Sequence, residues 1–229
     1  MKRFHHLFLI IKILFSSFTF VVEGGICASK PIAAKDFSSK EAGGSCGTAA
    51  TSGDGVDMDK YLAIQKEAMR AVYNKLLPDK ARKDAALARL ENPPRTWFGV
   101  TDVSPEGFIR EIKLSRKQLK GEIPQELRHL TKLQILYLAD NKLRGQIPRE
   151  LGELTELRTL FLNFNHLTGK IPQELRHLTK LQELSLSHNQ LTGKMPTELG
   201  ELNQLQHLNL SDNQLTGPIP PELMDIITH

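Results

Sequence analysis

The chain is poor in cysteine and in aromatic residues, and each shortage limits the class of protein it can be. Its 229 residues include two cysteines, Cys27 and Cys46. Because Cys27 lies in a segment that we expect to be removed, Cys46 has no partner within the mature chain, which excludes a disulfide framework. Phe, Trp and Tyr make up 6% of the residues, so aliphatic side chains must supply most of the buried area.

A strong excess of charge of one sign is also missing. The 30 Lys and Arg residues exceed the 26 Asp and Glu residues by four. Three of these bases and one acid lie in the segment that we expect to be removed, which leaves 27 bases against 25 acids, a net charge of +2. This balance gives no reason to expect nucleic acid or an anionic membrane surface as a partner.

Beyond the N-terminus, no apolar run approaches the length of about 18 residues that a membrane span needs. The N-terminus itself has Lys2 and Arg3, an apolar stretch over residues 7–22 and small residues that end at Ala28. This order is typical of a secretory signal peptide over residues 1–28. We therefore expect a secreted protein that has no membrane contact after cleavage. An uncleaved signal anchor, which would tether the protein to a membrane, and an organellar presequence fit the same residues.

The next two segments differ in composition. Residues 29–56 are mainly Ala, Ser, Gly, Lys and Thr, and they have too little apolar surface to fold, which predicts a flexible linker. Residues 57–94 are predicted to form a helical flank, a hairpin of two helices that Pro78 separates. The apolar residues of its first helix recur at three- and four-residue spacing and should pack on the rest of the chain: Leu62, Met69, Val72, Tyr73 and Leu76.

The sequence lacks the residue sets that carry out catalysis or bind metals. It contains no glycine-rich phosphate loop, zinc-binding pair or kinase signature. Asp57-Met58-Asp59 lacks the glycine and the distant glutamate of a calcium loop. His188 and His207 are expected to lie about 16 Å apart on a sheet, too far to share a metal ion. We expect no enzymatic activity, no metal and no cofactor.

What the sequence does contain is a repeat of 24 residues. The 11 residues PQELRHLTKLQ stand at 124–134 and again, unchanged, at 172–182. Copies at two periods indicate a duplicated pair of units, so their identity is no sign of a functional site. Asparagine, glycine and proline keep the same step along the chain: Asn141, Asn165, Asn189 and Asn213; Gly121, Gly145, Gly169, Gly193 and Gly217; Pro124, Pro148, Pro172, Pro196 and Pro220.

Each repeat unit carries a Leu-x-Leu core, such as Leu136–Leu138. In a strand, both leucines of this core point to the same side. One strand per unit at constant spacing predicts a parallel sheet, because the rest of the unit supplies the crossover. The asparagine lies just past the strand, where its amide can pair with backbone groups that would otherwise be buried without partners. Leucines of one unit are buried only against the next unit, so stacking stabilises the array.

The pattern L-x-G-x-I-P within these units resembles the plant-type leucine-rich repeat, over residues 97–223. The segment from Trp97 to Thr101 also resembles the N-terminal cap W-x-G-V-x-C of that family, although Asp102 stands in place of the cysteine. The resemblance implies an α/β fold in which residues 95–229 form a horseshoe-shaped solenoid of about five 24-residue units. A parallel sheet would line its concave side. Members of the family are receptor and co-receptor ectodomains and secreted inhibitors of cell-wall-degrading enzymes.

The concave face is the predicted binding site. Its strand positions bring together Tyr137, Phe161 and Phe164, and exposed aromatic residues are favoured at interaction sites. Charged residues are expected to surround this patch. Alternatively, Phe161 and Phe164 only cover neighbouring parts of the sheet. The predicted partner-binding residues are Lys113, Arg116, Tyr137, Asp140, Phe161, Phe164, Glu183 and His188.

The functional hypothesis is a secreted module that binds a protein or a peptide, in signalling or defence. About 300 Å² of exposed sheet is less than the roughly 800 Å² per partner of a standard interface, which favours a short peptide, a weak contact or a partner that also uses the flanks. A passive cell-surface or matrix protein and a fragment of a receptor-like kinase are the alternatives. Met224, Ile226 and Ile227 are expected to cover the C-terminal edge, where weak self-association is another possibility.

Overall fold

The computed structural model describes residues 57–224 and 226–227. The predicted signal peptide and linker lie outside these residues. Two helices come first, α1 over Met58–Leu76 and α2 over Lys80–Ala88. Asp57 accepts a hydrogen bond from the backbone amide of Lys60, and Asp79 accepts one from that of Arg82, so an aspartate caps each helix N-terminus. The chain leaves the helical conformation between them, at the position predicted from Pro78.

Helix α1 packs on the first coil of the solenoid, as expected from its apolar face. Its buried side chains Met69, Val72 and Leu76 belong to the same core as the repeat leucines. Gln65 is buried as well; its amide donates to Gly107 O at 3.1 Å and accepts from the amide of Ile109 at 2.7 Å. The sequence pattern did not predict this contact, because a glutamine within an apolar stripe has no signature of its partner.

Two short 3₁₀ helices, η1 over Arg89–Glu91 and η2 over Pro94–Thr96, lead into the cap. Trp97 is buried, and its Nε1 donates to Asn92 O at 2.7 Å. The Tyr73 hydroxyl donates to Phe98 O at 2.8 Å. Burial raises the pKa of Tyr73 above its ordinary value, so the phenol keeps the proton that this bond requires. The bond from Tyr73 to Phe98 fastens α1 to the start of the sheet.

Strands β1 (Val100–Val103) and β2 (Ile109–Lys113) form an antiparallel pair. Asp102, which stands where the related cap has cysteine, forms an ion pair with Arg110, with 2.8 Å between Nε and Oδ2. Both side chains are more than a third exposed, so this pair contributes at most about 1 kcal/mol. The cap is therefore held mainly by the buried contacts of α1 and Trp97.

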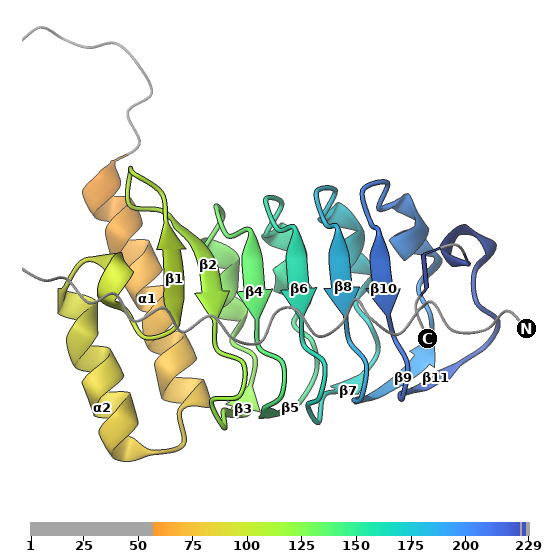
Figure 1. Cartoon of the computed structure of the whole chain (residues 1–229), viewed down its shortest axis with the longest axis horizontal. Coiled ribbons are helices and arrows are strands. Elements are labelled where there is room, and N and C mark those ends of the chain that lie inside the picture. The colour runs from red at the N-terminus through yellow and green to blue at the C-terminus, as the bar shows by residue number, and fades with distance from the viewer. Residues whose placement is uncertain (1–56, 225, 228–229) are drawn as a thin grey trace, which may run out of the picture. The chain divides into compact units, whose positions relative to one another are not determined.

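The main sheet has six strands in the order β1-β2-β4-β6-β8-β10. After the first pair it is parallel throughout, and each step pairs residues 24 apart, such as Leu136 with Leu160 and Leu160 with Leu184. These leucines are buried, and the strands stand side by side in Figure 1. The predicted parallel sheet and aliphatic columns are confirmed. The remaining bounds are β4 Ile135–Tyr137, β6 Thr159–Phe161, β8 Glu183–Ser185 and β10 His207–Asn209.

Two other sides complete each coil. Short strands form a two-stranded sheet, β3-β5, and a three-stranded sheet, β11-β9-β7, along one border of the main sheet (Figure 1). Their bounds are β3 Lys120–Glu122, β5 Lys142–Arg144, β7 Thr168–Gly169, β9 Gln190–Lys194 and β11 Gln214–Thr216. One 3₁₀ helix per coil lies on the convex side: η3 Gln125–His129, η4 Arg149–Glu153, η5 Gln173–His177, η6 Thr197–Glu201 and η7 Pro221–Leu223.

The repeat asparagines link one coil to the next, as predicted. Asn141 Nδ2 donates to Leu114 O and Leu138 O, both at 2.9 Å, and its Oδ1 accepts from the amide of Leu119 at 3.0 Å. Asn165, Asn189 and Asn213 bond in the same pattern. Each side chain thus satisfies backbone groups of two coils, which fixes the distance between them.

The C-terminal edge is covered in part. Ile226 and Ile227 pack against the core, and Ile227 forms an isolated parallel bridge with Leu208 of β10. The prediction was wrong for Met224, which is 61% exposed. Met224 lies directly after the 3₁₀ turn of η7, where the chain has not yet reached the edge of the sheet.

Candidate binding surface

The concave surface consists of columns of residues that the parallel register brings side by side. Four positions of each coil contribute to it, at steps of 24 residues. From one coil to the next they are Glu111, Ile135, Thr159, Glu183 and His207; Lys113, Tyr137, Phe161, Ser185 and Asn209; Ser115, Ala139, Asn163, Ser187 and Ser211; and Arg116, Asp140, Phe164, His188 and Asp212.

The three predicted aromatic residues do lie together on this surface. The rings of Tyr137 and Phe161 stack with their centroids 4.9 Å apart. Phe164, one position past β6, stacks on the imidazole of His188 at 4.1 Å and is 51% exposed. Burial raises the pKa of Tyr137 above its ordinary value, and the nearby carboxylate of Glu183 adds to this. The two stacked pairs meet in one coil, since Phe161 and Phe164 lie three residues apart in the chain.

The backbone of the last column is unusual. Arg116, Asp140, Phe164, His188 and Asp212 all have φ between 52° and 58°. For residues other than glycine this left-handed conformation is disfavoured by about 1–3 kcal/mol, yet the turn requires it in every coil, where amides such as that of Phe164 bond to the next coil. The turn thus explains the backbone conformation of Phe164, but it does not explain why an exposed aromatic ring occupies this position.

Most of the predicted charged residues form pairs with neighbouring side chains. Lys113 Nζ lies 2.8 Å from Glu111 Oε1 and 5.7 Å from the centre of the Tyr137 ring. Arg116 Nε lies 2.9 Å from Asp140 Oδ2, and His188 Nε2 lies 3.2 Å from Asp212 Oδ2. The 24-residue step places Arg116 beside Asp140 and His188 beside Asp212, but the ion pairs themselves were not predicted. Because they are exposed, they hold little energy and can be exchanged for charges of a partner.

Asn163 was not predicted as a site residue, and it differs from its neighbours. Its Oδ1 is buried and has no hydrogen-bond partner among the described residues. It occupies the column between Ala139 and Ser187, with Phe161 and Phe164 two and one positions away in the chain. A buried acceptor without a partner is unfavourable by about 1–3 kcal/mol. Because the atom has almost no exposed area, a ligand could bond to it only if the Asn163 side chain turned outward.

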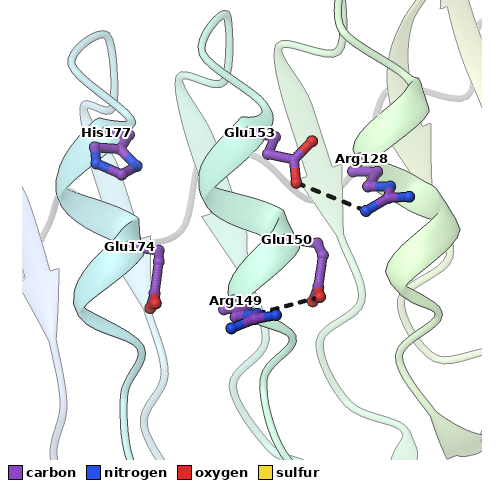
Figure 2. Close-up of a pocket in the computed structure, with 6 residues that line it drawn as sticks. All are labelled: Arg128, Arg149, Glu150, Glu153, Glu174 and His177. Carbon is purple, nitrogen blue, oxygen red and sulfur yellow. Dashed lines mark hydrogen bonds and ion pairs between the residues drawn. The ribbon is translucent and has the colours of Figure 1, made fainter.

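The convex side carries the pocket shown in Figure 2. Its volume is about 340 Å³, and it lies over η3, η4 and η5. The charges around it are mixed, and most are paired, as in Arg128 with Glu153 at 3.9 Å and Arg149 with Glu150 at 3.4 Å. His177 lies at its border as a copy of His129. It offers no apolar anchor, so the concave face is the stronger candidate.

Two further findings concern only the part of the chain that the structure describes. Within residues 57–224 and 226–227, no group of three or more His, Cys, Asp or Glu side chains is placed to hold a metal ion. Among these same residues, no helix has the length and apolar character needed to cross a membrane.

The repeat, the parallel sheet and the asparagine ladder define a leucine-rich repeat solenoid, and the chain belongs to that family. The family model of a leucine-rich repeat region matches residues 108–223. The solved structures that resemble the chain include ectodomains of plant receptor kinases, which confirms the plant type of the repeat. Among curated proteins, no sequence matches the chain.

Three solved structures illustrate the similarity. The BIR3–SERK2 complex from Arabidopsis thaliana contains a chain with 33% identity and a TM-score of 0.63, over 70% of this chain and 89% of that one. PEPR1 in PEPR1–AtPEP1 has 34% identity and a TM-score of 0.65, over 70% of this chain but 23% of its own. A plant ice-binding protein has 28% identity and a TM-score of 0.63, over 72% of this chain and 53% of its own.

Proposed function

We propose that the protein is a secreted binding module without catalytic activity that recognises a protein or a peptide through its concave face, in signalling or defence. The observation that carries the proposal is the aromatic surface formed by Tyr137, Phe161 and Phe164, part of which is exposed on a strained backbone. Two of the similar structures, BIR3–SERK2 and PEPR1–AtPEP1, hold the related chain with a partner, which supports the same kind of role.

The chemistry of the surface indicates what would bind. A flat apolar or aromatic side chain of the partner fits on the stacked rings of Tyr137 and Phe161, and stacking of this kind adds about 0.5–1.5 kcal/mol beyond the buried area. The Asn163 amide, whose Oδ1 is buried without a partner, would gain a hydrogen bond by turning outward to a backbone N–H beside that side chain. The exposed pair of Arg116 and Asp140 would accept charged groups at the border. An extended peptide offers all three groups, and its short contact suits the small area of the sheet.

The test is a selection of random linear peptides on the immobilised protein, followed by binding measurements on a double variant, Tyr137→Ser with Phe161→Ser. We expect selected peptides to carry an aromatic or large apolar residue and to lose at least tenfold in affinity for the variant. The melting temperature should fall by no more than a few degrees, because both side chains are only half-buried. A matched variant on the convex side, His129→Ser with His177→Ser, should bind as the wild type does. Peptides that bind both variants equally would contradict the proposal.

The third similar structure is named for ice binding, so the fold alone does not select a function. The concave face favours a protein or peptide partner, because aromatic, acidic and basic side chains alternate irregularly across it. Measurement of ice recrystallisation would separate the two functions: we expect no inhibition by the protein at concentrations where it binds the selected peptides.

A further inference from the structure

Five cations lie on the border of the solenoid beside the concave sheet. They are Lys120 on β3, Lys142 and Arg144 on β5, Lys170 directly after β7, and Lys194 on β9. All are exposed, and within the described residues none has a carboxylate oxygen within 4.0 Å. On the concave and convex faces, by contrast, cations such as Arg116 and Arg128 form ion pairs with neighbouring acids. We call these five residues the basic border.

The register brings these cations close together. Strands β3 and β5 pair Lys120 directly with Lys142 and Glu122 with Arg144. Like charges that face each other on neighbouring strands are destabilising, so the Lys120–Lys142 pair is unfavourable unless an anion lies between the two. Neighbouring strands of successive coils lie about 4.8 Å apart. The side chain of Lys170 lies over Gly193 of the following coil. The strands that carry these cations follow one another along this border in Figure 1.

This charge is segregated and does not follow from the composition. The 57–229 segment has 24 bases and 22 acids, a net charge of +2. The basic border holds five cations against one acid, Glu122, so the rest of this segment has a net charge of −2. The cations also occupy three different positions of the 24-residue unit, which means that copying of a single residue does not explain them.

We propose that the basic border is a binding site for a linear carboxylated polysaccharide, whose chain runs along the solenoid axis. A row of cations, one or two for each coil, matches a polymer that carries an acid at regular short intervals. Thr168, Thr192, Gln146 and Gln190 lie between the cations and supply donors and acceptors for sugar hydroxyls. This site is separate from the concave face and does not depend on the peptide ligand proposed there.

The same positions disfavour two other polyanions. The outward residues of the border include no Phe, Tyr or Trp on which a nucleic-acid base could stack. Leu143 on β5 and Leu191 on β9, which alternate with the outward residues, are fully buried, so these two side chains are not available to insert into a membrane. Four of the five cations are lysines, whose ammonium groups are point charges on flexible side chains and require no fixed geometry of the anion.

The probe is a fluorescent oligogalacturonate, and binding is measured by anisotropy at several salt concentrations. In the variant Lys142→Gln, Arg144→Gln, Lys170→Gln and Lys194→Gln we expect affinity to fall at least tenfold, with a weaker salt dependence than the wild type because fewer counterions are released. The charge-preserving variant Lys142→Arg, Lys170→Arg and Lys194→Arg should bind within twofold of the wild type. Circular dichroism and the melting temperature confirm that each variant is folded.

The control removes four exposed cations elsewhere: Lys60→Gln, Arg70→Gln, Lys80→Gln and Arg95→Gln. It changes the net charge equally and should leave binding within twofold. Equal losses in both variants would overturn the proposal, because net charge alone would then explain binding. Equal affinity for the fully methyl-esterified oligosaccharide, or binding to vesicles with anionic phospholipid but not to oligogalacturonate, would overturn it as well. The Tyr137→Ser, Phe161→Ser variant should bind the probe normally, so the two proposed sites can fail separately.

Discussion

At the scale of single residues, two asparagines in the same coil have opposite roles. Asn165 uses its whole amide, with Nδ2 donating to Leu138 O and Leu162 O and Oδ1 accepting from the amide of Leu143. Asn163, two residues earlier, has a buried Oδ1 without a partner. The first side chain joins two coils, and the second leaves an acceptor unpaired in a concave column. The same residue type therefore serves the fold at one position and, in our proposal, the ligand at the other.

This contrast gives a direct test by alanine substitution. Asn163→Ala should leave the free energy of unfolding unchanged or raise it by up to about 1 kcal/mol, because an unsatisfied buried acceptor is removed. The same variant should lose at least tenfold in affinity for the selected peptides. Asn165→Ala should lower the free energy of unfolding by about 2–4 kcal/mol, because three backbone groups lose their partner. Chemical denaturation and peptide titration measure both, and a large loss of stability in Asn163→Ala would contradict the assigned role.

At the scale of secondary structure, the joint between α1 and the first coil depends on one glycine. Gly121, in β3, has φ of 98°, and the carbonyl oxygen of Lys75 at the end of α1 lies where a Cβ would stand. Gly107 has nearly the same φ, 94°, but a Cβ there would meet only the end of Met58, at 3.9 Å. The two positions share the backbone conformation and differ in the close approach of the helix.

Alanine at these two glycines should therefore separate strain from contact. Gly107→Ala should lower the free energy of unfolding by about 1 kcal/mol, the effect of positive φ alone. Gly121→Ala should lower it by about 3 kcal/mol or more, because the backbone of α1 must also move away. Denaturant unfolding of both variants, with fluorescence of the buried Trp97 as the signal, measures the difference. Equal losses would show that α1 does not press on the first coil.

Much of this architecture follows from the sequence period. The columns of Leu136, Leu160 and Leu184 could be predicted because burial repeats at every coil, and the position of Tyr137 beside Phe161 follows from the same step. What the period does not contain are contacts set by side-chain conformation. The stacking of Phe164 on His188 depends on a left-handed residue in the turn, and the sequence gives no sign of it because left-handed residues are usually glycine or asparagine.

The candidate site was predictable only to the level of position. The columns of the concave face follow from the 24-residue step, whereas the ion pairs of Lys113 with Glu111 and of Arg116 with Asp140 were not predicted. The basic border was missed for a different reason. Its cations occupy three separate positions of the unit, and the strands of the border pair at steps of 22 residues, as in Lys120 with Lys142. A search at the 24-residue period aligns Lys120 with Arg144 and Lys170 with Lys194, but it does not show that all five cations lie along one border.

At the scale of the whole described solenoid, the two ends differ in burial. The first coil is covered by α1, whose side chains enter the core. In the last coil Leu215 is only half-buried and Ile219 is 38% exposed, although their counterparts Leu191 and Ile171 are buried. Because each coil of a solenoid is stabilised by its neighbours, the last coil should open locally at a lower free energy than the rest.

Hydrogen exchange of four equivalent amides tests this gradient. The amides of Leu119, Leu143, Leu167 and Leu191 each donate to the Oδ1 of an asparagine in the next coil, at 3.0 Å. The partner of Leu191 is Asn213 of the last coil, so opening of that coil frees the Leu191 amide alone. We expect the Leu191 amide to exchange at least tenfold faster than the other three amides. This ratio corresponds to an opening free energy that is about 1.4 kcal/mol lower.

The variant Asn213→Ala should speed exchange at Leu191 and leave Leu119 and Leu143 unchanged, since the effect of losing one coil decays along the array. If all four amides exchanged at one rate, the solenoid would open as a single cooperative unit, and the exposure of Ile219 would carry no energetic meaning. A gradient would instead place the rigid part of the molecule between α1 and β8. Tyr137, Phe161 and most of the basic border lie within that part, so both proposed surfaces would be held in position before a partner binds.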